Sequence, residues 1–184
     1  VHQAGSDDET RSHFEAQDLM EHGSRDGGGW LGRWLRTRTT RSPLAAVSIG
    51  KTRAESMRGA PASIAIASPS DFTFGSTDDA FQAGLKQLYG AEYGALGAAG
   101  RDTLAAMQSL EDLASTPYRP ASGAAYPNNN LGRDLKVAAQ LVKSNTGVSA
   151  ITVDHNGWDT HFGAAALMGG LMDTLGRSLA AFRS

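Results

Sequence analysis

The residues best suited to chemistry lie in one short stretch, ITVDHNGWDTHF, at positions 151–162. It holds two of the chain's five histidines together with two aspartates. Asp154 is the first residue after the run VSAITV, whose apolar and β-branched residues predict a strand. In open α/β sheets, ligands bind at the carboxyl ends of strands, where loops converge. The stretch is therefore a candidate site.

Five side chains of this loop offer oxygen or nitrogen donors: Asp154, His155, Asn156, Asp159 and His161. Mixed carboxylate and imidazole donors suit zinc, manganese or iron, whereas calcium prefers oxygen alone. Gly157 would permit the bend that folds the later donors back toward the strand. A structural alternative has equal weight at this point. In it, Asp154 caps a turn, Asp159 caps the following helix, and His161 packs near the start of that helix.

One loop rarely completes a site, so further groups must come from elsewhere in the chain. The stretch SHFEAQD offers His13 and Asp18, and His22 is a weaker candidate. A lone histidine in the first turn of a helix has an ordinary structural explanation, which we favour for His13 when it is considered alone. There is no Gly-x-Ser-x-Gly elbow, and the glycine-rich segment at 25–32 lacks the Lys-Ser/Thr of a phosphate loop. No nucleophile can be assigned.

The elements that must position these residues follow from periodicity. Apolar runs at 43–50, 61–68 and 148–153 predict strands, and six segments predict helices: 10–23, 27–38, 76–90, 100–114, 131–147 and 163–182. Thr10 or Ser12 would cap the first helix and Ser76 the third. In the second helix, Trp30 and Trp34 share a face that we expect to pack inward. The order predicts one α/β domain over residues 1–184, layered around a mainly parallel sheet.

Composition narrows the function classes. The chain has 184 residues, 40% of them hydrophobic, and a net charge of −2, so no overall field attracts nucleic acid or an anionic membrane. Basic residues gather between 33 and 58, where a solvated arginine-rich loop is favoured over an anion-binding patch. The absence of cysteine excludes thiolate chemistry and disulfides. No apolar run is long enough to predict a transmembrane segment.

The order of several blocks indicates a family. Six blocks follow one another along nearly the whole chain: TRSHFEAQDLMEHG, GWLGRWL, AVSIG, RGAPASIAI, YPNNNLGRDLKVAAQLVKSNTGVSAITVDHNGWDTHF and LMDTLGRSLAAF. This arrangement resembles the domain-of-unknown-function family 1501 of bacterial exported proteins, which typically carry twin-arginine signals. That family is assigned to the alkaline-phosphatase-like superfamily, together with sulfatases, phosphopentomutases and cofactor-independent phosphoglycerate mutases.

The resemblance implies a three-layer α/β/α sandwich with a two-metal site at the carboxyl ends of its strands. It implies that Asp159 and His161 are metal ligands, with Asp154 and His155 as secondary candidates, and that zinc or manganese is the metal. His13 would lie near the site. Family members carry a Gly-Gly-Asn-Asp-Gly-type loop before this region and an Asp-His-Gly motif after it. Because both are absent here and the chain begins with Val1, we expect an internal fragment without its signal segment.

Two main functions remain open. The resemblance implies a metal-dependent hydrolase-like protein, exported to the periplasm or outside the cell, that acts on phosphate or sulfate esters. The alternative is a non-catalytic exported protein that keeps the fold for binding or assembly at the cell envelope. A truncated reading frame without a function of its own is a third possibility.

Overall fold

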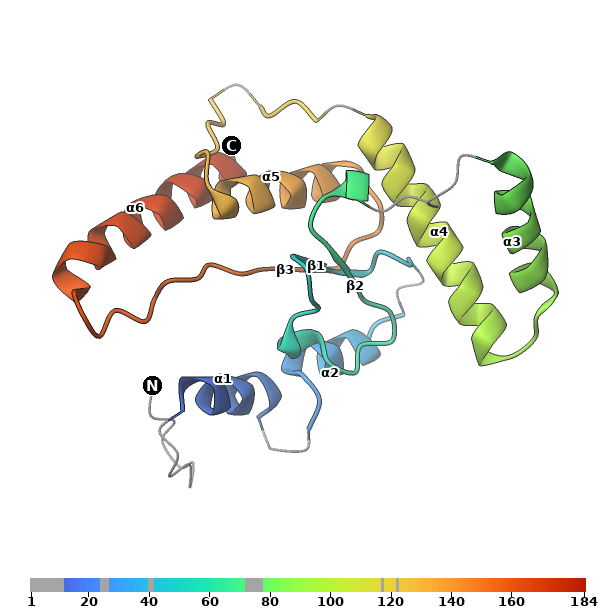
Figure 1. The fold of residues 1–184 in the computed structure, drawn as a ribbon, viewed down its shortest axis with the longest axis horizontal. Coiled ribbons are helices and arrows are strands. Elements are labelled where there is room, and N and C mark those ends of the chain that lie inside the picture. The colour runs from blue at the N-terminus through green and yellow to red at the C-terminus, as the bar shows by residue number, and fades with distance from the viewer. Residues whose placement is uncertain (1–11, 24–26, 40–41, 72–77, 117, 122) are drawn as a thin grey trace.

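The computed structural model describes residues 12–23, 27–39, 42–71, 78–116, 118–121 and 123–184 (Figure 1). Its three strands are β1 (Ala46–Ile49), β2 (Ile64–Ile66) and β3 (Ala150–Val153). The α-helices are α1 (His13–His22), α2 (Trp30–Arg36), α3 (Asp79–Ala91), α4 (Ala95–Ser115), α5 (Asn130–Lys143) and α6 (Ala164–Arg183). Two short 3-10 helices, η1 (Glu55–Met57) and η2 (Pro69–Asp71), complete the elements.

The strands form one parallel sheet with the order β2-β1-β3. Val47 of β1 pairs with Ile64 on one side and with Ile151 on the other, so β1 is the central strand. All four of its residues are buried, Ser48 among them, as is typical of a strand covered on both faces. The predicted α/β class and its parallel sheet are confirmed.

Helices cover both faces of this sheet. Because side chains alternate along a strand, Val47 and Ile49 point to one face, where they pack against Leu110 of α4 and Leu141 of α5. Ala46 points to the other face and packs with Met57 of η1 and with residues of α2. Figure 1 shows α5 and α6 on one side of the strands and α1 and α2 on the other. The arrangement has three layers.

Local sequence signals fix several helix ends. Ser12 Oγ accepts the Glu15 N–H at 3.3 Å at the start of α1, and Gly23 ends that helix with a φ of 69°. Asn129 caps α5 through the Gly132 N–H at 2.8 Å. Asp78 caps α3, whereas the predicted cap Ser76 lies outside the described residues.

The prediction that Trp30 and Trp34 pack inward is wrong. They are 52% and 40% exposed, and Leu31 and Leu35 are buried in their place. The reason lies at Gly32, where a Cβ atom would come within 2.3 Å of the Arg58 carbonyl oxygen. This close backbone approach turns the Gly32 face of α2 toward η1, so the tryptophans face outward.

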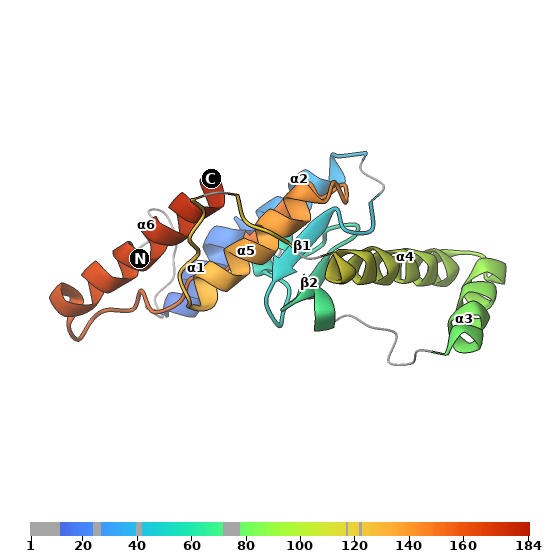
Figure 2. The ribbon, with the colours of Figure 1, turned by 90° about the horizontal axis from the view of Figure 1, so that it is seen from above.

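The last helix, α6, packs along α5 through the buried Ser178 and Ala181 (Figure 2). Large apolar side chains elsewhere on α6 are half exposed, among them Met172 and Leu179. In the part of the chain that the structure describes, no helix is both long and apolar enough to cross a membrane.

Candidate functional site

Two predicted metal ligands come together in the loop between β3 and α6. The Asp159 Oδ1 and His161 Nε2 atoms are 3.2 Å apart. Both side chains are largely exposed, at 67% and 63%. The structural alternative for Asp159 is not realised, because α6 begins at Ala164 after Gly163 and has no side-chain cap. The Asp159 side chain therefore does not cap α6.

The pair lines a cavity of about 650 Å³ between this loop and α1. Trp158 and Thr160 line it on the loop side, and the α1 side is formed by Ala16, Gln17, Met20 and Glu21. The structure therefore brings α1, which carries the SHFEAQD block, against the GWDTH block, although the two are more than one hundred residues apart in the sequence.

Of the three α1 residues expected near the site, the structure describes the side chains of Asp18 and His22, whereas the His13 side chain lies outside the described part. His13 is the first residue of α1, one turn before Gln17. Asp18 is exposed and does not line the cavity. His22 is 7% exposed and faces away from the cavity lining, with its Nε2 atom 2.9 Å from Glu55 Oε1. Neither of these two joins the Asp159–His161 pair.

Sequence reasoning missed Gln17 and Glu21. They share one face of α1 because they are four residues apart, and that spacing was the signal available. The carboxylate of Glu21 is held in place, because the Trp30 Nε1–H donates to its Oε2 atom at 3.0 Å. This bond connects the cavity wall to α2 and explains what the outward-facing Trp30 contributes.

Polar contacts hold α1 to the body of the protein. The Glu55 Oε1 atom lies 2.9 Å from His22 Nε2 and 3.0 Å from Arg58 Nη1. Arg33 of α2 donates to the His22 carbonyl oxygen at 2.7 Å and also to the Gly28 carbonyl oxygen. The position of the α1 wall thus depends on a buried imidazole and on charged groups beyond the cavity.

The secondary candidates, Asp154 and His155, lie at the carboxyl end of β3. Asp154 is exposed, and Asp134 of α5 is close enough to interact with it electrostatically. Burial raises the pKa of Asp134, the Asp154 carboxylate raises it further, and Arg133 opposes both effects. The His155 ring meets Trp158 edge-on with centroids 5.1 Å apart, and its buried Nδ1 atom makes no hydrogen bond within the described structure.

The contact between Asp159 and His161 has the length of an ion pair, 3.2 Å. Two ligands of one tetrahedral zinc, each bonded at about 2.0–2.2 Å, lie roughly 3.3–3.6 Å apart. A small separation of the two side chains would therefore bring them to the spacing that one zinc ion requires. Among the described residues, no three His, Asp or Glu side chains lie close enough together to hold one ion. The described chain therefore supplies two ligands, and Asp154 and His155 do not join them.

The described arginines between positions 33 and 58 mostly bind protein groups. Arg36 donates to the Gly59 carbonyl oxygen at 2.8 Å, and the Arg38 guanidinium lies 5.3 Å from the centre of the Trp34 ring. Arg53 reaches the Ser63 hydroxyl at 3.4 Å. These contacts give the arginines structural roles around α2 and η1.

No protein-family model matches the chain, and comparison with curated proteins and with solved structures gives no significant match.

Proposed function

We propose that this chain carries one side of the active site of an exported, metal-dependent hydrolase-like protein that acts on phosphate or sulfate esters. Asp159 and His161 would bind a divalent metal ion, zinc or manganese. The observation that supports this most directly is their 3.2 Å contact on the wall of a 650 Å³ cavity. The loop that carries them follows a strand of a parallel sheet, where α/β proteins place their ligands.

The surrounding residues fit an ester substrate. When bound, the metal would supply Lewis-acid polarisation of the ester. The Gln17 side-chain amide on the opposite wall can donate to the ester oxygens. Trp158 and Met20 add apolar surface that would cover the organic part of the substrate and keep out water.

The family assignment and the export of the protein belong to the same proposal. They rest on the order of the sequence blocks and on the placement of two of them, SHFEAQD and GWDTH, at one cavity. The three-layer architecture with a parallel sheet is compatible with the alkaline-phosphatase-like superfamily.

Metal binding tests the proposal directly. Zinc and manganese titrations by isothermal calorimetry should show one site in the wild-type chain. Asp159→Ala and His161→Ala should each weaken that site at least about tenfold, because each removes one of two protein ligands. Asp173→Ala is the matched control, since Asp173 is equally exposed at 65% and pairs with Arg177 on α6. Absence of binding by the wild type, or equal binding by Asp159→Ala, would refute the assignment.

A second function is favoured by one observation. Among the described residues, no third metal ligand joins Asp159 and His161, and no serine lines the cavity, where Thr160 is the side chain with a hydroxyl group. A protein that binds an anionic ester or envelope component without turning it over would need no more than this. Turnover of p-nitrophenyl phosphate or p-nitrophenyl sulfate by the metal-loaded protein would support hydrolysis. Metal binding without turnover would support the binding function instead.

A further inference from the structure

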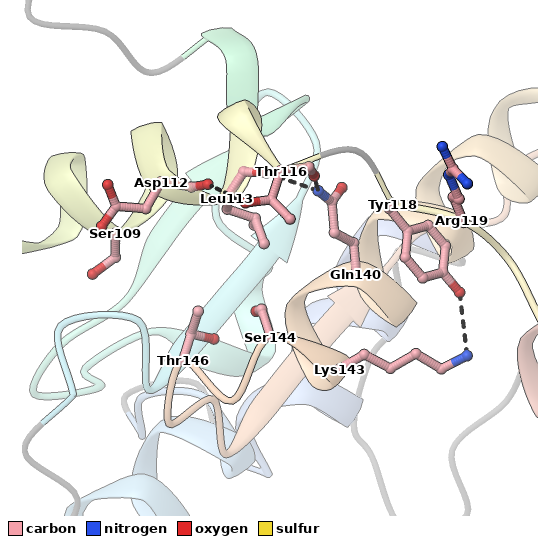
Figure 3. Close-up of a pocket in the computed structure, with 10 residues that line it drawn as sticks. All are labelled: Ser109, Asp112, Leu113, Thr116, Tyr118, Arg119, Gln140, Lys143, Ser144 and Thr146. Atoms are coloured by element: carbon pink, nitrogen blue, oxygen red, sulfur yellow. Dashed lines mark hydrogen bonds between the residues drawn. The ribbon is translucent and has the colours of Figure 1, made fainter.

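A second cavity lies near the amino end of β3, whereas the Asp159–His161 pair follows the carboxyl end of that strand. It has a volume of about 460 Å³ and is formed where α4 and α5 both end, close to the segments that follow them (Figure 3). Thr146, which lines it, precedes β3, whereas Asp159 and His161 follow that strand. The two cavities are therefore separate, and ligand binding in the second cavity is independent of the proposed function.

Most polar groups of this lining can only accept hydrogen bonds from a ligand. Four hydroxyl groups already donate to backbone carbonyls at 2.9–3.2 Å: those of Ser109, Thr116, Ser144 and Thr146. The Gln140 amide nitrogen donates to the carbonyl oxygens of Leu113 and Thr116. Since a hydroxyl has one hydrogen, these groups present lone pairs to a ligand, as the Gln140 carbonyl oxygen does.

The electrostatics of the α4 side of the cavity favour a cation. Asp112 lines it, with its Oδ1 atom accepting the Gln108 side-chain amide at 3.2 Å, and α4 ends three residues later at Ser115. The last carbonyl groups of a helix carry the negative end of the helix dipole. A ligand ammonium, which has three hydrogens to donate, matches both the charge and the surplus of acceptors there.

On the other side of the cavity, where α5 ends, the full positive charge of Lys143 exceeds the partial negative charge of the last α5 carbonyl groups. The Lys143 Nζ atom lies 3.4 Å from the Tyr118 hydroxyl and 5.6 Å from the centre of its ring. Arg119 lies on the same side, and Figure 3 shows Lys143, Tyr118 and Arg119 across the cavity from Ser109 and Asp112. A carboxylate can take its hydrogen bonds from the Lys143 ammonium, which Tyr118 holds in place.

We propose that this cavity binds a small amino-carboxylate, with its ammonium group at Asp112 and its carboxylate at Lys143. The ligand class follows from the opposite charges on the two sides and from the acceptor-rich lining between them. The volume is sufficient for a molecule of this size.

Three probes of equal chain length test the two charged groups of the ligand one at a time. Binding of 6-aminohexanoate, hexanoate and hexylamine is followed by isothermal calorimetry or by amide chemical shifts. We expect 6-aminohexanoate to bind at least about tenfold more tightly than either singly charged probe, the minimum for a hydrogen bond between charged groups. Equal affinities for the three probes, or no binding of 6-aminohexanoate, would overturn the proposal. This test needs the wild-type protein alone.

Two substitutions locate the site. Asp112→Asn should remove the advantage of 6-aminohexanoate over hexanoate, and Lys143→Met should remove its advantage over hexylamine. Lys143→Arg should keep most of the affinity. Asp102→Asn on α4 and Lys136→Met on α5 are exposed controls that should bind like the wild type. If the controls weaken binding as much as the site variants do, the ligand binds elsewhere and the assignment is wrong.

Discussion

In the centre of β1, the Ser48 hydroxyl links three segments of the chain. It accepts the Thr152 hydroxyl of β3 at 2.9 Å and the Ala54 N–H at 3.0 Å, and it lies 3.4 Å from Met57 Sδ. Ser48 itself is 3% exposed. We expect Ser48→Ala to lower the free energy of unfolding by about 1–3 kcal/mol, because two donors near the core lose their acceptor.

Urea denaturation monitored by circular dichroism measures this loss. Ser115→Ala is the control, because the exposed Ser115 hydroxyl bonds only to the Asp112 carbonyl of its own helix among the contacts that the structure describes. Its free energy of unfolding should stay within about 0.5 kcal/mol of the wild type. A Ser48→Ala variant as stable as the control would show that water replaces the missing hydroxyl.

At the level of elements, the attachment of α1 depends on Glu55. We expect Glu55→Gln to accelerate amide hydrogen exchange across residues 13–22 about fivefold, or about 1 kcal/mol, since Glu55 is partly exposed and its ion pairs are screened. Exchange in α5 should not change. Asp18→Asn, on the exposed side of α1, should leave both helices unaffected. Equal acceleration in α1 and α5 would indicate general destabilisation and contradict a local role.

The same contact should depend on pH. Burial pushes the pKa of Glu55 upward, but the hydrogen bonds and charges of Arg58 and His22 outweigh it, so the pKa is lowered below its ordinary value of 4.5. A carboxyl with a lowered folded pKa stabilises the fold fully above its unfolded pKa and loses that contribution as the pH falls through the folded value. Protection of α1 should therefore decrease below about pH 4.5 in the wild type and not in Glu55→Gln. A decrease of equal size in both would assign the effect to another group.

Strands and helices were largely predictable from the sequence, whereas the faces they bury were less so. The three runs predicted β1, β2 and β3 because short apolar, partly β-branched segments are typical of strands, and only β1 is buried along its whole length. The face of α2 was mispredicted because aromatic size suggested burial, while the close approach at Gly32 depends on a neighbour more than twenty residues away.

The candidate site was likewise predictable from the sequence only in part. The chemistry of Asp159 and His161 was visible from residue types and spacing, and their closeness is local. The contributions of Gln17 and Glu21 depend on where α1 docks, which is set by His22, Glu55 and Arg33. Contacts of that kind leave no periodic signal in the sequence. Whether the pair binds a metal remains a prediction.

For the molecule as a whole, the hydrophobic core on the α4–α5 side of the sheet is the main source of stability. Leu110 is fully buried there, between the sheet and α5. We expect Leu110→Ala to cost about 2–5 kcal/mol of unfolding free energy through lost burial and the cavity it leaves. Phe162→Ala should have little effect, because Phe162 is 97% exposed. Comparable melting temperatures for the two variants would show that this cluster does not carry the fold.

The pairing of β1 with β3 also sets the order in which the chain can fold during synthesis. Ser48 and Thr152, which bond across these strands, are 104 residues apart. A ribosome adding about 5–20 residues per second needs roughly 5–20 s to make that interval. Until then β1 can pair with β2 alone, and the other edge of β1, the most buried strand, has no partner strand. Nascent chains stalled before residue 150 should therefore depend on chaperones far more than released chains that include β3.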